Sequence, residues 1–319
     1  MDDILRRLGF IGLIPVAVIE DENIAVPAAQ ALSDGGIDTI EITLRTPQGI
    51  PAISKIREAC PDMLVGAGTV LSVDSAKQAV DAGAQYIVAP GFDAKLVEWC
   101  LKNNMTITPG CVTPSEISLA MAYGLKVVKF FPANIYGGAK GCQALHAPFG
   151  SISFIPTGGI GESNLAEYAG LPCVHAIGGG WLFNTAYVKA GNFEAITTAA
   201  AKAVSVLLGF ELGHVGMNLS SDSEARAAAD RLCTGFGLAL KEGSTSYFTG
   251  GIVEINKSKG RGAMGHIAIR TNNADRAVYY LQKRGFSPDW TSEKSENGRT
   301  TLIYFEDEIG GFAVHLLQK

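Results

Sequence analysis

A lysine lies inside the apolar segment VVKFFPAN (127–134), with branched or aromatic residues on both sides. Lysine is rarely buried, because taking an ammonium group out of water costs free energy. One interpretation of Lys129 is a side chain at a strand edge whose ammonium group reaches solvent. The other is an amine that its apolar surroundings keep uncharged, so that it can attack a ketone and form a Schiff base. The iminium then draws electrons from the neighbouring carbon–carbon bond, which would allow that bond to be cleaved.

A glutamate and an arginine lie in a second apolar segment, TIEITLR (39–45). Alternate side chains of a strand share a face, so Glu41 projects on the same side as two threonines and Arg45. A buried carboxylate beside a lysine can form a structural ion pair, or it can move protons as a general acid and base. The planar guanidinium of Arg45 can bind a carboxylate through two parallel hydrogen bonds. We expect both residues near the carboxyl end of one strand.

Three glycine-rich segments follow apolar runs: GAGTV (66–70), PTGGI (156–160) and AIGGGW (176–181). Glycines leave backbone N–H groups accessible, and next to a helix N-terminus such groups can bind a phosphate. A single Gly-Gly pair can be only a tight turn. Two of them after consecutive strands indicate a phosphorylated ligand.

The last third of the chain contains three of its five histidines, each inside a predicted strand. His214 and Glu254 lie in the first and last strands of one predicted unit, and His266 and His315 take the matching places in a second. Zinc, nickel, cobalt and ferrous iron accept imidazole and carboxylate ligands. The four residues therefore predict a divalent metal site between these two repeated copies in the last third of the chain. The alternative is a set of histidines without metal, in a domain that only assembles the protein.

The elements that must position Lys129 and Glu41 repeat with a period of roughly 20 to 25 residues up to Leu208. Each repeat is a short apolar run, a turn and an amphipathic segment, which indicates a parallel sheet with both faces covered by helices. Eight repeats predict an α/β fold with a closed (β/α)8 or TIM barrel rather than an open sheet. The eight apolar runs are residues 14–19, 39–45, 64–70, 86–91, 105–111, 127–134, 152–159 and 174–180.

The pattern changes after Leu208. Two copies of one unit follow, each read as a strand, a helix and three strands, with first strands at 214–221 and 265–271. An internal repeat of this kind predicts a separate α+β domain made of paired βαβββ units. We therefore expect two domains, residues 1–208 and residues 209–319.

Composition and charge argue against several classes of partner. The formal net charge is −5 and basic residues form no run, whereas nucleic-acid and membrane surfaces need clustered positive charge. No apolar run approaches the ~18 residues of a membrane span. The six cysteines are irregularly spaced, which predicts buried, reduced thiols in a cytoplasmic protein rather than a disulfide framework.

The segments IEITLRT, VGAGTVL, APG, VKFFPAN, PTGGI and IGGGWL make residues 1–205 resemble the 2-keto-3-deoxy-6-phosphogluconate and 4-hydroxy-2-oxoglutarate (KDPG and KHG) aldolase family. The resemblance implies a homotrimeric class I aldolase without a cofactor. It would reversibly cleave either 2-oxo acid to pyruvate plus glyceraldehyde 3-phosphate or glyoxylate. Lys129 would be the Schiff-base lysine and Glu41 the general acid and base. The pyruvate end would contact Arg45, Thr69 and Pro90, and the phosphate end Thr157, Gly158, Gly159, Gly179 and Gly180.

Two positions depart from that family pattern. Family members similar to the phosphogluconate enzyme often have Ser where this chain has Gly180, and an acidic residue where it has Asn134. Loss of the serine hydroxyl removes a hydrogen-bond donor from the phosphate end. The sequence is therefore compatible with a phosphorylated substrate and with an unphosphorylated one.

The two βαβββ copies resemble the vicinal-oxygen-chelate superfamily of glyoxalases, bleomycin-resistance proteins and dioxygenases. The resemblance implies that His214, Glu254, His266 and His315 bind a divalent metal. His315 stands where many glyoxalase I enzymes have Glu, so this set has one carboxylate and three imidazoles. A metal-dependent reaction on an aldehyde or a 2-oxo compound, and a non-catalytic assembly role, are the two functions left open.

Overall fold

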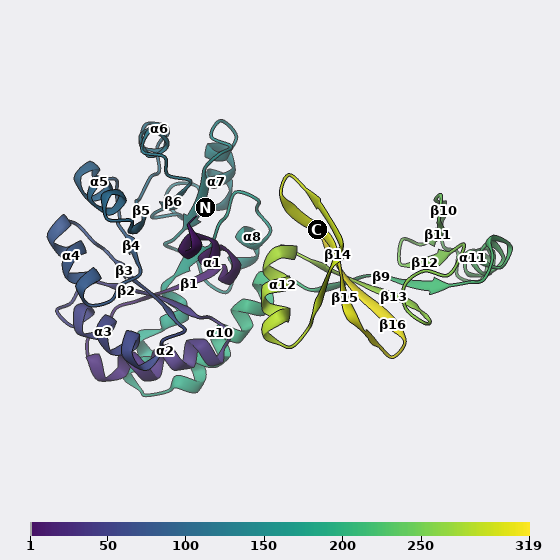
Figure 1. The fold of residues 1–319 in the computed structure, drawn as a ribbon, viewed down its shortest axis with the longest axis horizontal. Helices are drawn as coiled ribbons and strands as arrows, with labels where there is room; N and C mark the ends of the chain where they lie inside the picture. The colour runs from purple at the N-terminus through teal and green to yellow at the C-terminus, as the bar shows by residue number, and fades with distance from the viewer. Residues whose placement is uncertain (1) are drawn as a thin grey trace. The chain divides into compact units, whose positions relative to one another are not determined.

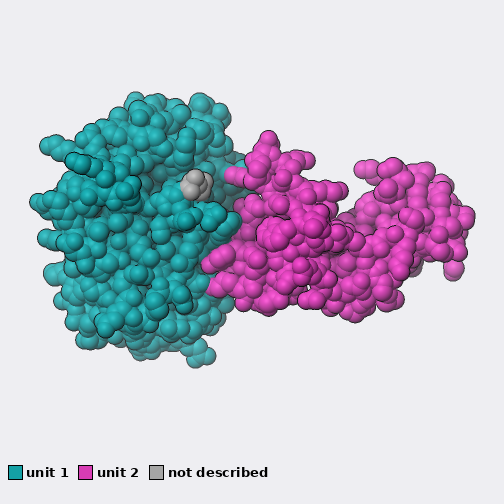
Figure 2. All heavy atoms as spheres, in the orientation of Figure 1, with its two compact units in different colours: residues 1–207 teal, residues 208–319 magenta. Residues whose placement is uncertain are grey.

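The computed structural model describes residues 2–319. The chain divides into two compact units, Met1–Leu207 and Leu208–Lys319, which Figure 2 shows in separate colours. Each unit has its own strands and its own buried apolar residues.

The first unit is built on eight short parallel strands that follow one another around a barrel (Figure 1). Strands β1 to β5 pair in chain order, β8 pairs with β1, and β6 pairs with β7. Single bridges, Gly110 to Lys129 and Thr157 to Gly178, link β6 to the end of β5 and β7 to β8. The predicted TIM-barrel-like fold is thus confirmed. The strands are β1 (Leu13–Ala17), β2 (Thr39–Thr43), β3 (Leu64–Gly68), β4 (Tyr86–Val88), β5 (Thr106–Thr108), β6 (Val127–Phe130), β7 (Ser153–Pro156) and β8 (Ile177–Gly179).

Helices cover the outside of this barrel because their apolar faces pack on the strands (Figure 1). Their ends follow local sequence signals. Helix α6, for example, begins with Pro114 in its first turn and a capping box between Thr113 and Glu116. The helices of this unit are α1 (Asp3–Ile11), η1 (Glu22–Ile24), α2 (Ala25–Asp34), α3 (Gly49–Ala59), α4 (Val73–Asp81), α5 (Ala94–Lys102), α6 (Pro114–Ala122), α7 (Gly138–His146), α8 (Leu165–Ala169), η2 (Gly180–Phe183), α9 (Thr185–Lys189) and α10 (Phe193–Leu208).

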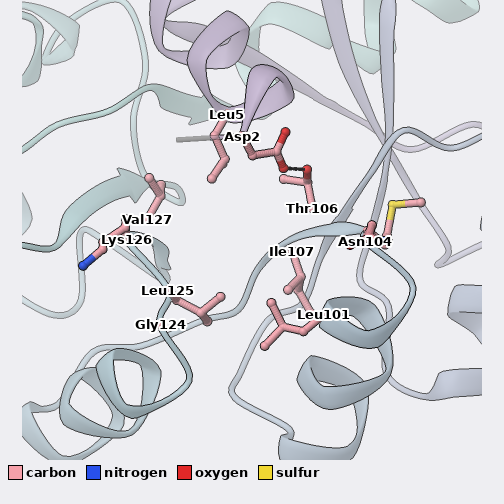
Figure 3. Close-up of a pocket in the computed structure, with 11 residues that line it drawn as sticks. Asp2, Leu5, Leu101, Asn104, Thr106, Ile107, Gly124, Leu125, Lys126 and Val127 are labelled. Carbon is pink, nitrogen blue, oxygen red and sulfur yellow. Dashed lines mark hydrogen bonds between the residues drawn. The ribbon is translucent and has the colours of Figure 1, made fainter.

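A cavity of about 590 Å³ opens at the amino-terminal ends of β5 and β6, beside α1 (Figure 3). Its lining is mostly apolar, and Thr106 donates a hydrogen bond to Asp2 there. Active sites of such barrels lie at the other end, where the strands have their carboxyl termini. This cavity therefore lies at the end of the barrel opposite the candidate site.

The second unit is one eight-stranded mixed sheet in the order β10-β11-β12-β9-β13-β16-β15-β14, with two helices (Figure 1). The first strands of the two copies, β9 and β13, pair antiparallel at the centre of the sheet. Each also pairs in parallel with the last strand of its own copy, β12 or β16. The predicted order of strand, helix and three strands is confirmed for both copies. The elements are β9 (Glu211–Asn218), α11 (Asp222–Phe236), β10 (Leu240–Glu242), β11 (Ser246–Thr249), β12 (Val253–Asn256), β13 (Gly265–Thr271), α12 (Ala274–Lys283), β14 (Pro288–Glu296), β15 (Arg299–Ile309) and β16 (Phe312–Gln318).

The six cysteines are unpaired, as predicted, and four of them are buried. The prediction of burial is wrong for Cys60 and Cys233, which are half-buried. Cys60 caps the carboxyl end of α3, and Cys233 lies within α11. Within residues 2–319 no helix combines the length and the apolar character that a membrane crossing requires.

Candidate active site

Lys129 and Glu41 meet inside the barrel although 88 residues separate them in the chain. Lys129 is the third residue of β6 and Glu41 the third residue of β2. The Lys129 Nζ lies 3.3 Å from the Glu41 Oε1, and the two residues are only 5% and 3% exposed. The interpretation of Lys129 as an ammonium group that reaches solvent is therefore wrong. An amine and a carboxylate at this distance can exchange a proton.

Two glycines of β3 leave room for the groups that face them. A Cβ atom at Gly68 would lie 2.1 Å from the Glu41 Oε1, and one at Gly66 would lie 2.1 Å from the Tyr86 ring. The Tyr86 hydroxyl in turn hydrogen-bonds to the Thr39 Oγ1 at 3.0 Å. Burial, and the nearby Glu41 carboxylate, raise the pKa of Tyr86 far above its ordinary value, so this hydroxyl stays protonated. Sequence analysis missed the role of Gly68; glycine inside an apolar strand was the available signal.

The lysine also has an aromatic neighbour that the sequence analysis did not single out. The Lys129 Nζ lies 5.1 Å from the centre of the Phe131 ring. A ring face at this distance attracts a cation, and its edge and face also keep water away from the amine. Phe131 therefore places an aromatic ring beside the Lys129 Nζ.

Arg45 and Thr69 lie together beyond the carboxyl ends of β2 and β3. The Arg45 Nε donates a hydrogen bond to the Thr69 Oγ1 at 3.3 Å. The prediction that Arg45 lies within the strand is wrong, because β2 ends at Thr43 and the chain then turns toward α3. Thr69 has a φ of 56°, a strained value for a β-branched residue, and such strain is often found at functional sites.

Pro90 follows β4 at the same end of the barrel. Its carbonyl oxygen packs against Gly110, where a Cβ atom would lie only 2.0 Å away. Gly110 forms the bridge to Lys129, so the close approach places Pro90 next to the strand of the lysine. The structure thus gathers the three residues predicted for the carboxylate end around the carboxyl ends of β2 to β6.

Thr157 leads into the glycine pair that follows β7. Its N–H donates to the Phe130 carbonyl at 3.0 Å, which ties the pair to the strand of the lysine. Gly158 and Gly159 have φ values of 96° and 71°, which only glycine adopts readily. A Cβ atom at Gly178 would lie 2.2 Å from the Thr157 Oγ1, so the threonine side chain reaches across to β8.

The glycines at the end of β8 differ in the space around them. Gly179 is covered by its own neighbour Trp181, whose ring would lie 1.5 Å from an added Cβ. Gly180 is open, because an added Cβ would meet only the Val16 carbonyl oxygen at 3.8 Å. The residues predicted for the phosphate end therefore lie at the ends of β7 and β8, and Gly180 has unused space beside it.

In the second unit, His214, His266 and Glu254 form a triangle. The two His Nε2 atoms are 3.0 Å apart, and each lies 3.1 Å from the Glu254 Oε2. His315 completes the predicted set, since the ligand atoms of the three histidines lie within 4.8 Å of one another. All four predicted residues come together, from β9, β12, β13 and β16.

The hydrogen bonds within this cluster do not give every imidazole nitrogen a suitable partner. If both Nε2–H groups donate to Glu254, they face each other at 3.0 Å with no acceptor between them. Both ring nitrogens of His315 are buried without a hydrogen-bond partner. Burial, His266 and His214 lower the pKa of His315 to about 3, so its ring is neutral at pH 7, as a metal ligand must be. The donor set and its unsatisfied nitrogens fit a divalent cation.

Small residues and aromatic rings fix the orientation of the histidines. A Cβ atom at Gly216 would lie 2.1 Å from the His266 ring, so only glycine lets that ring lie across β9. Tyr304 stacks on His315 with ring centres 4.5 Å apart.

Burial raises the pKa of Glu254, but hydrogen bonds from His214, His266 and Ser246 outweigh this effect and hold that pKa below its ordinary range. The glutamate is therefore ionised at pH 7.

The remaining two histidines have structural partners. The His146 Nδ1 lies 2.9 Å from the Ile152 carbonyl oxygen, and the His175 Nε2 lies 2.7 Å from the Leu5 carbonyl oxygen. Both contacts tie a loop to a helix of the barrel.

Comparisons with known proteins match the first unit. A family model described as KDPG and KHG aldolase matches residues 2–199. The 2-dehydro-3-deoxy-phosphogluconate aldolase of Treponema pallidum (strain Nichols) is 42% identical over 207 residues, which are 65% of this chain and 99% of that relative. The KHG/KDPG aldolase of Escherichia coli (strain K12) is 41% identical over 192 residues, or 60% of this chain and 90% of the relative.

Solved structures of aldolases also match the first unit. The 4-hydroxy-2-oxoglutarate aldolase/2-deydro-3-deoxyphosphogluconate aldolase from TTHB1 superimposes with a TM-score of 0.60 at 35% identity, covering 65% of this chain and 99% of that one. The KDPG aldolase of Legionella pneumophila, captured with pyruvate as a covalent carbinolamine, gives a TM-score of 0.59 at 36% identity. That match covers 61% of this chain and 96% of the Legionella chain.

Proposed function

The chain belongs to the KDPG and KHG aldolase family of aldehyde-lyases, and we propose that its barrel, residues 1–208, is a class I aldolase that uses Lys129 as its nucleophile. The observation that carries this proposal is the buried contact of 3.3 Å between the Lys129 Nζ and the Glu41 Oε1. The carbinolamine of the Legionella relative with pyruvate supports a covalent route. The reaction requires no cofactor, because the lysine supplies the electron sink.

In the proposed reaction, the 2-oxo acid is cleaved while it is bound to Lys129 as a Schiff base. The Lys129 Nζ attacks C2 of the 2-oxo acid, and loss of water leaves an iminium. Glu41 takes the proton of the C4 hydroxyl, the C3–C4 bond breaks, and its electron pair moves into the iminium to form an enamine. The aldehyde departs, Glu41 returns a proton to C3, and water hydrolyses the resulting iminium to release pyruvate and the free amine.

The substrate ends follow from the chemistry of the groups around the lysine. We propose that Arg45, Thr69 and Pro90 bind the carboxylate end, because a guanidinium pairs well with a carboxylate. Thr157, Gly158, Gly159, Gly179 and Gly180 would form the distal end, where backbone N–H groups can hold a phosphate. The substrates would be 2-keto-3-deoxy-6-phosphogluconate, 4-hydroxy-2-oxoglutarate or both, giving pyruvate with glyceraldehyde 3-phosphate or glyoxylate.

Steady-state pyruvate release from the two substrates tests this assignment. We expect both Lys129→Met and Glu41→Gln to lower kcat strongly, with no activity above background for Lys129→Met. Lys126→Met is the matched control, because Lys126 is exposed and lies just before the same strand. Full cleavage by Lys129→Met would contradict the proposal.

A second function is favoured by the histidine cluster. We propose that residues 209–319 form a vicinal-oxygen-chelate domain in which His214, Glu254, His266 and His315 bind zinc, nickel, cobalt or ferrous iron. When bound, such an ion would polarise an oxygen atom of an aldehyde or 2-oxo compound. Elemental analysis of protein purified without chelator tests it. Metal well below one equivalent, not restored by added nickel or zinc, would leave this unit an assembly module instead.

The assembly itself is also a proposal. We propose a cytoplasmic homotrimer of the barrel, which large exposed apolar side chains such as Leu71 and Ile135 support. Light scattering of the whole chain and of a chain ending at Gly209 tests the role of each unit. A monomeric barrel that becomes trimeric only with residues 210–319 would assign assembly to the second unit.

A further inference from the structure

The inner face of β3 offers the Glu41 side chain two spaces, and a tyrosine fills one of them. Resting on the aldolase function proposed above, we infer that Tyr86 is a positioning residue for Glu41. Its ring occupies the space over Gly66, which leaves the Glu41 carboxylate the space over Gly68. Tyr86 thereby holds the carboxylate toward Lys129, and it acts through Glu41 without contact to the substrate.

The pairing of three parallel strands places these residues on one inner face. Glu41 of β2 pairs with Gly66 of β3, which pairs in turn with Tyr86 of β4. Paired residues of a sheet project to the same side, and residues two apart along one strand share a face. Gly68 therefore lies on the same face as Gly66, one step nearer the carboxyl end of β3, where active sites of such barrels are built.

The contacts of the two glycines show which side chain takes which space. A Cβ atom at Gly66 would lie 2.1 to 2.5 Å from three atoms of the Tyr86 ring. One at Gly68 would lie 2.1 Å from the Glu41 Oε1. Because non-bonded carbon atoms stay about 3.5–4.0 Å apart, the ring excludes Glu41 from the space over Gly66. The carboxylate over Gly68 meets the Lys129 Nζ at 3.3 Å.

The hydroxyl group of Tyr86 fixes the ring in this place. The Thr39 Oγ1 donates its one proton to the Leu64 carbonyl oxygen at 2.9 Å, so it accepts at its contact of 3.0 Å with the tyrosine. Tyr86 therefore donates to Thr39, and burial keeps its hydroxyl protonated by raising its pKa far above the ordinary value. Both residues are 0% exposed. The tyrosine proton thus points to Thr39, and Glu41 stays free to exchange protons at the lysine.

A positioning role and a role in core packing alone differ in what they change. Loss of any large core side chain lowers stability. Formation of the Schiff base with pyruvate needs Lys129, whereas proton transfer at C3 of the bound pyruvate also needs Glu41 in the right place. Removal of the Tyr86 ring therefore slows the proton transfer and leaves the lysine able to form its adduct.

Deuterium exchange at C3 of pyruvate, followed by NMR in D2O, measures this proton transfer without an aldehyde. The Schiff base loses a C3 proton to Glu41, the electron pair of that C–H bond moves into the iminium, and a deuteron returns to C3 by the reverse step. We expect Tyr86→Leu to slow the exchange at least about tenfold, since a misplacement of about 1 Å can cost ~100-fold. The amount of borohydride adduct at saturating pyruvate stays that of the parent protein.

Tyr168→Leu is the matched control, because Tyr168 is also a buried tyrosine, 2% exposed, but lies on helix α8. We expect it to exchange at the parent rate. Exchange in Tyr86→Leu within about twofold of the parent rate, or an equal loss in both variants, would overturn the inference.

A milder series keeps the ring and decides the question if Tyr86→Leu does not fold. Tyr86→Phe, Thr39→Val and the double variant all remove the same hydrogen bond. Each therefore slows exchange about threefold, and the double variant is no slower than either single one. Unchanged exchange, or single effects that multiply in the double variant, would overturn the inference and leave the aldolase in place. A parent protein that forms no adduct with pyruvate would overturn both.

Discussion

The contact between Gly68 and Glu41 allows the proton-transfer role of the glutamate to be tested without removing its carboxylate. In Gly68→Ala the new methyl group would lie 2.1 Å from the Glu41 Oε1 and 2.6 Å from its Cγ. To regain an ordinary contact of about 3.4 Å the carboxylate must move by about 1.3 Å, and a misplacement of about 1 Å can cost ~100-fold in rate. We therefore expect kcat to fall about 100-fold, and the overpacked strand to lose about 1–3 kcal/mol of stability.

The assay is steady-state pyruvate release, followed at a temperature where a thermal melt shows the variant to be folded. We expect KM to change less than kcat, because the substitution displaces Glu41 and keeps the Arg45 and Thr69 side chains that we propose for the substrate carboxylate. Gly150→Ala is the control, since an added Cβ there meets nothing within 4 Å. A Gly68→Ala enzyme with kcat within about twofold of the wild type would refute the reasoning, because a displacement of this size should not be tolerated.

Three further predictions concern the phosphate end and the metal cluster. Gly180→Ser should raise the preference for the phosphorylated substrate about tenfold, because there is room for a hydroxyl that donates to phosphate. Gly216→Ala should lower the affinity for added nickel or zinc at least about tenfold, because the new methyl group displaces the His266 ring. Chelator should remove metal from the second unit and leave the rate of cleavage in the barrel unchanged, because a Schiff base needs no metal ion.

Each of these outcomes has a direct check. Ratios of kcat/KM for the two substrates report on Gly180→Ser, and an unchanged ratio would show that this end does not bind phosphate. Metal titration reports on Gly216→Ala, with Gly235→Ala as the control because its added Cβ meets nothing within 4 Å. A cleavage rate that falls on chelation and recovers with added metal would contradict a metal-free mechanism.

The barrel could be predicted from the sequence because its signals are local and repeated. Short apolar runs alternate with amphipathic helices, and each of the eight predicted runs overlaps an observed strand. Strand ends were less predictable. The run TIEITLR looks continuous through Arg45, yet β2 ends at Thr43, since the end of a strand depends on where the neighbouring strand stops and the next helix begins.

The candidate sites were predictable in residue type but not in geometry. Lys129 and Glu41 stand out because charged residues are costly inside apolar strands, and the histidine positions match between the two copies. The supporting residues gave little signal. Gly68 and Gly216 matter only through neighbours on other strands, and the stacking of Tyr304 on His315 follows from the pairing of β15 with β16.

Reduction with borohydride in the presence of pyruvate, followed by peptide mass spectrometry, tests the central claim most directly. The account predicts one reduced pyruvate unit attached to the peptide that contains Lys129, with no such adduct in Lys129→Met and an undiminished one in Lys126→Met. Intact protein without the adduct, or an adduct on a different lysine, would contradict the assignment of Lys129 as the nucleophile.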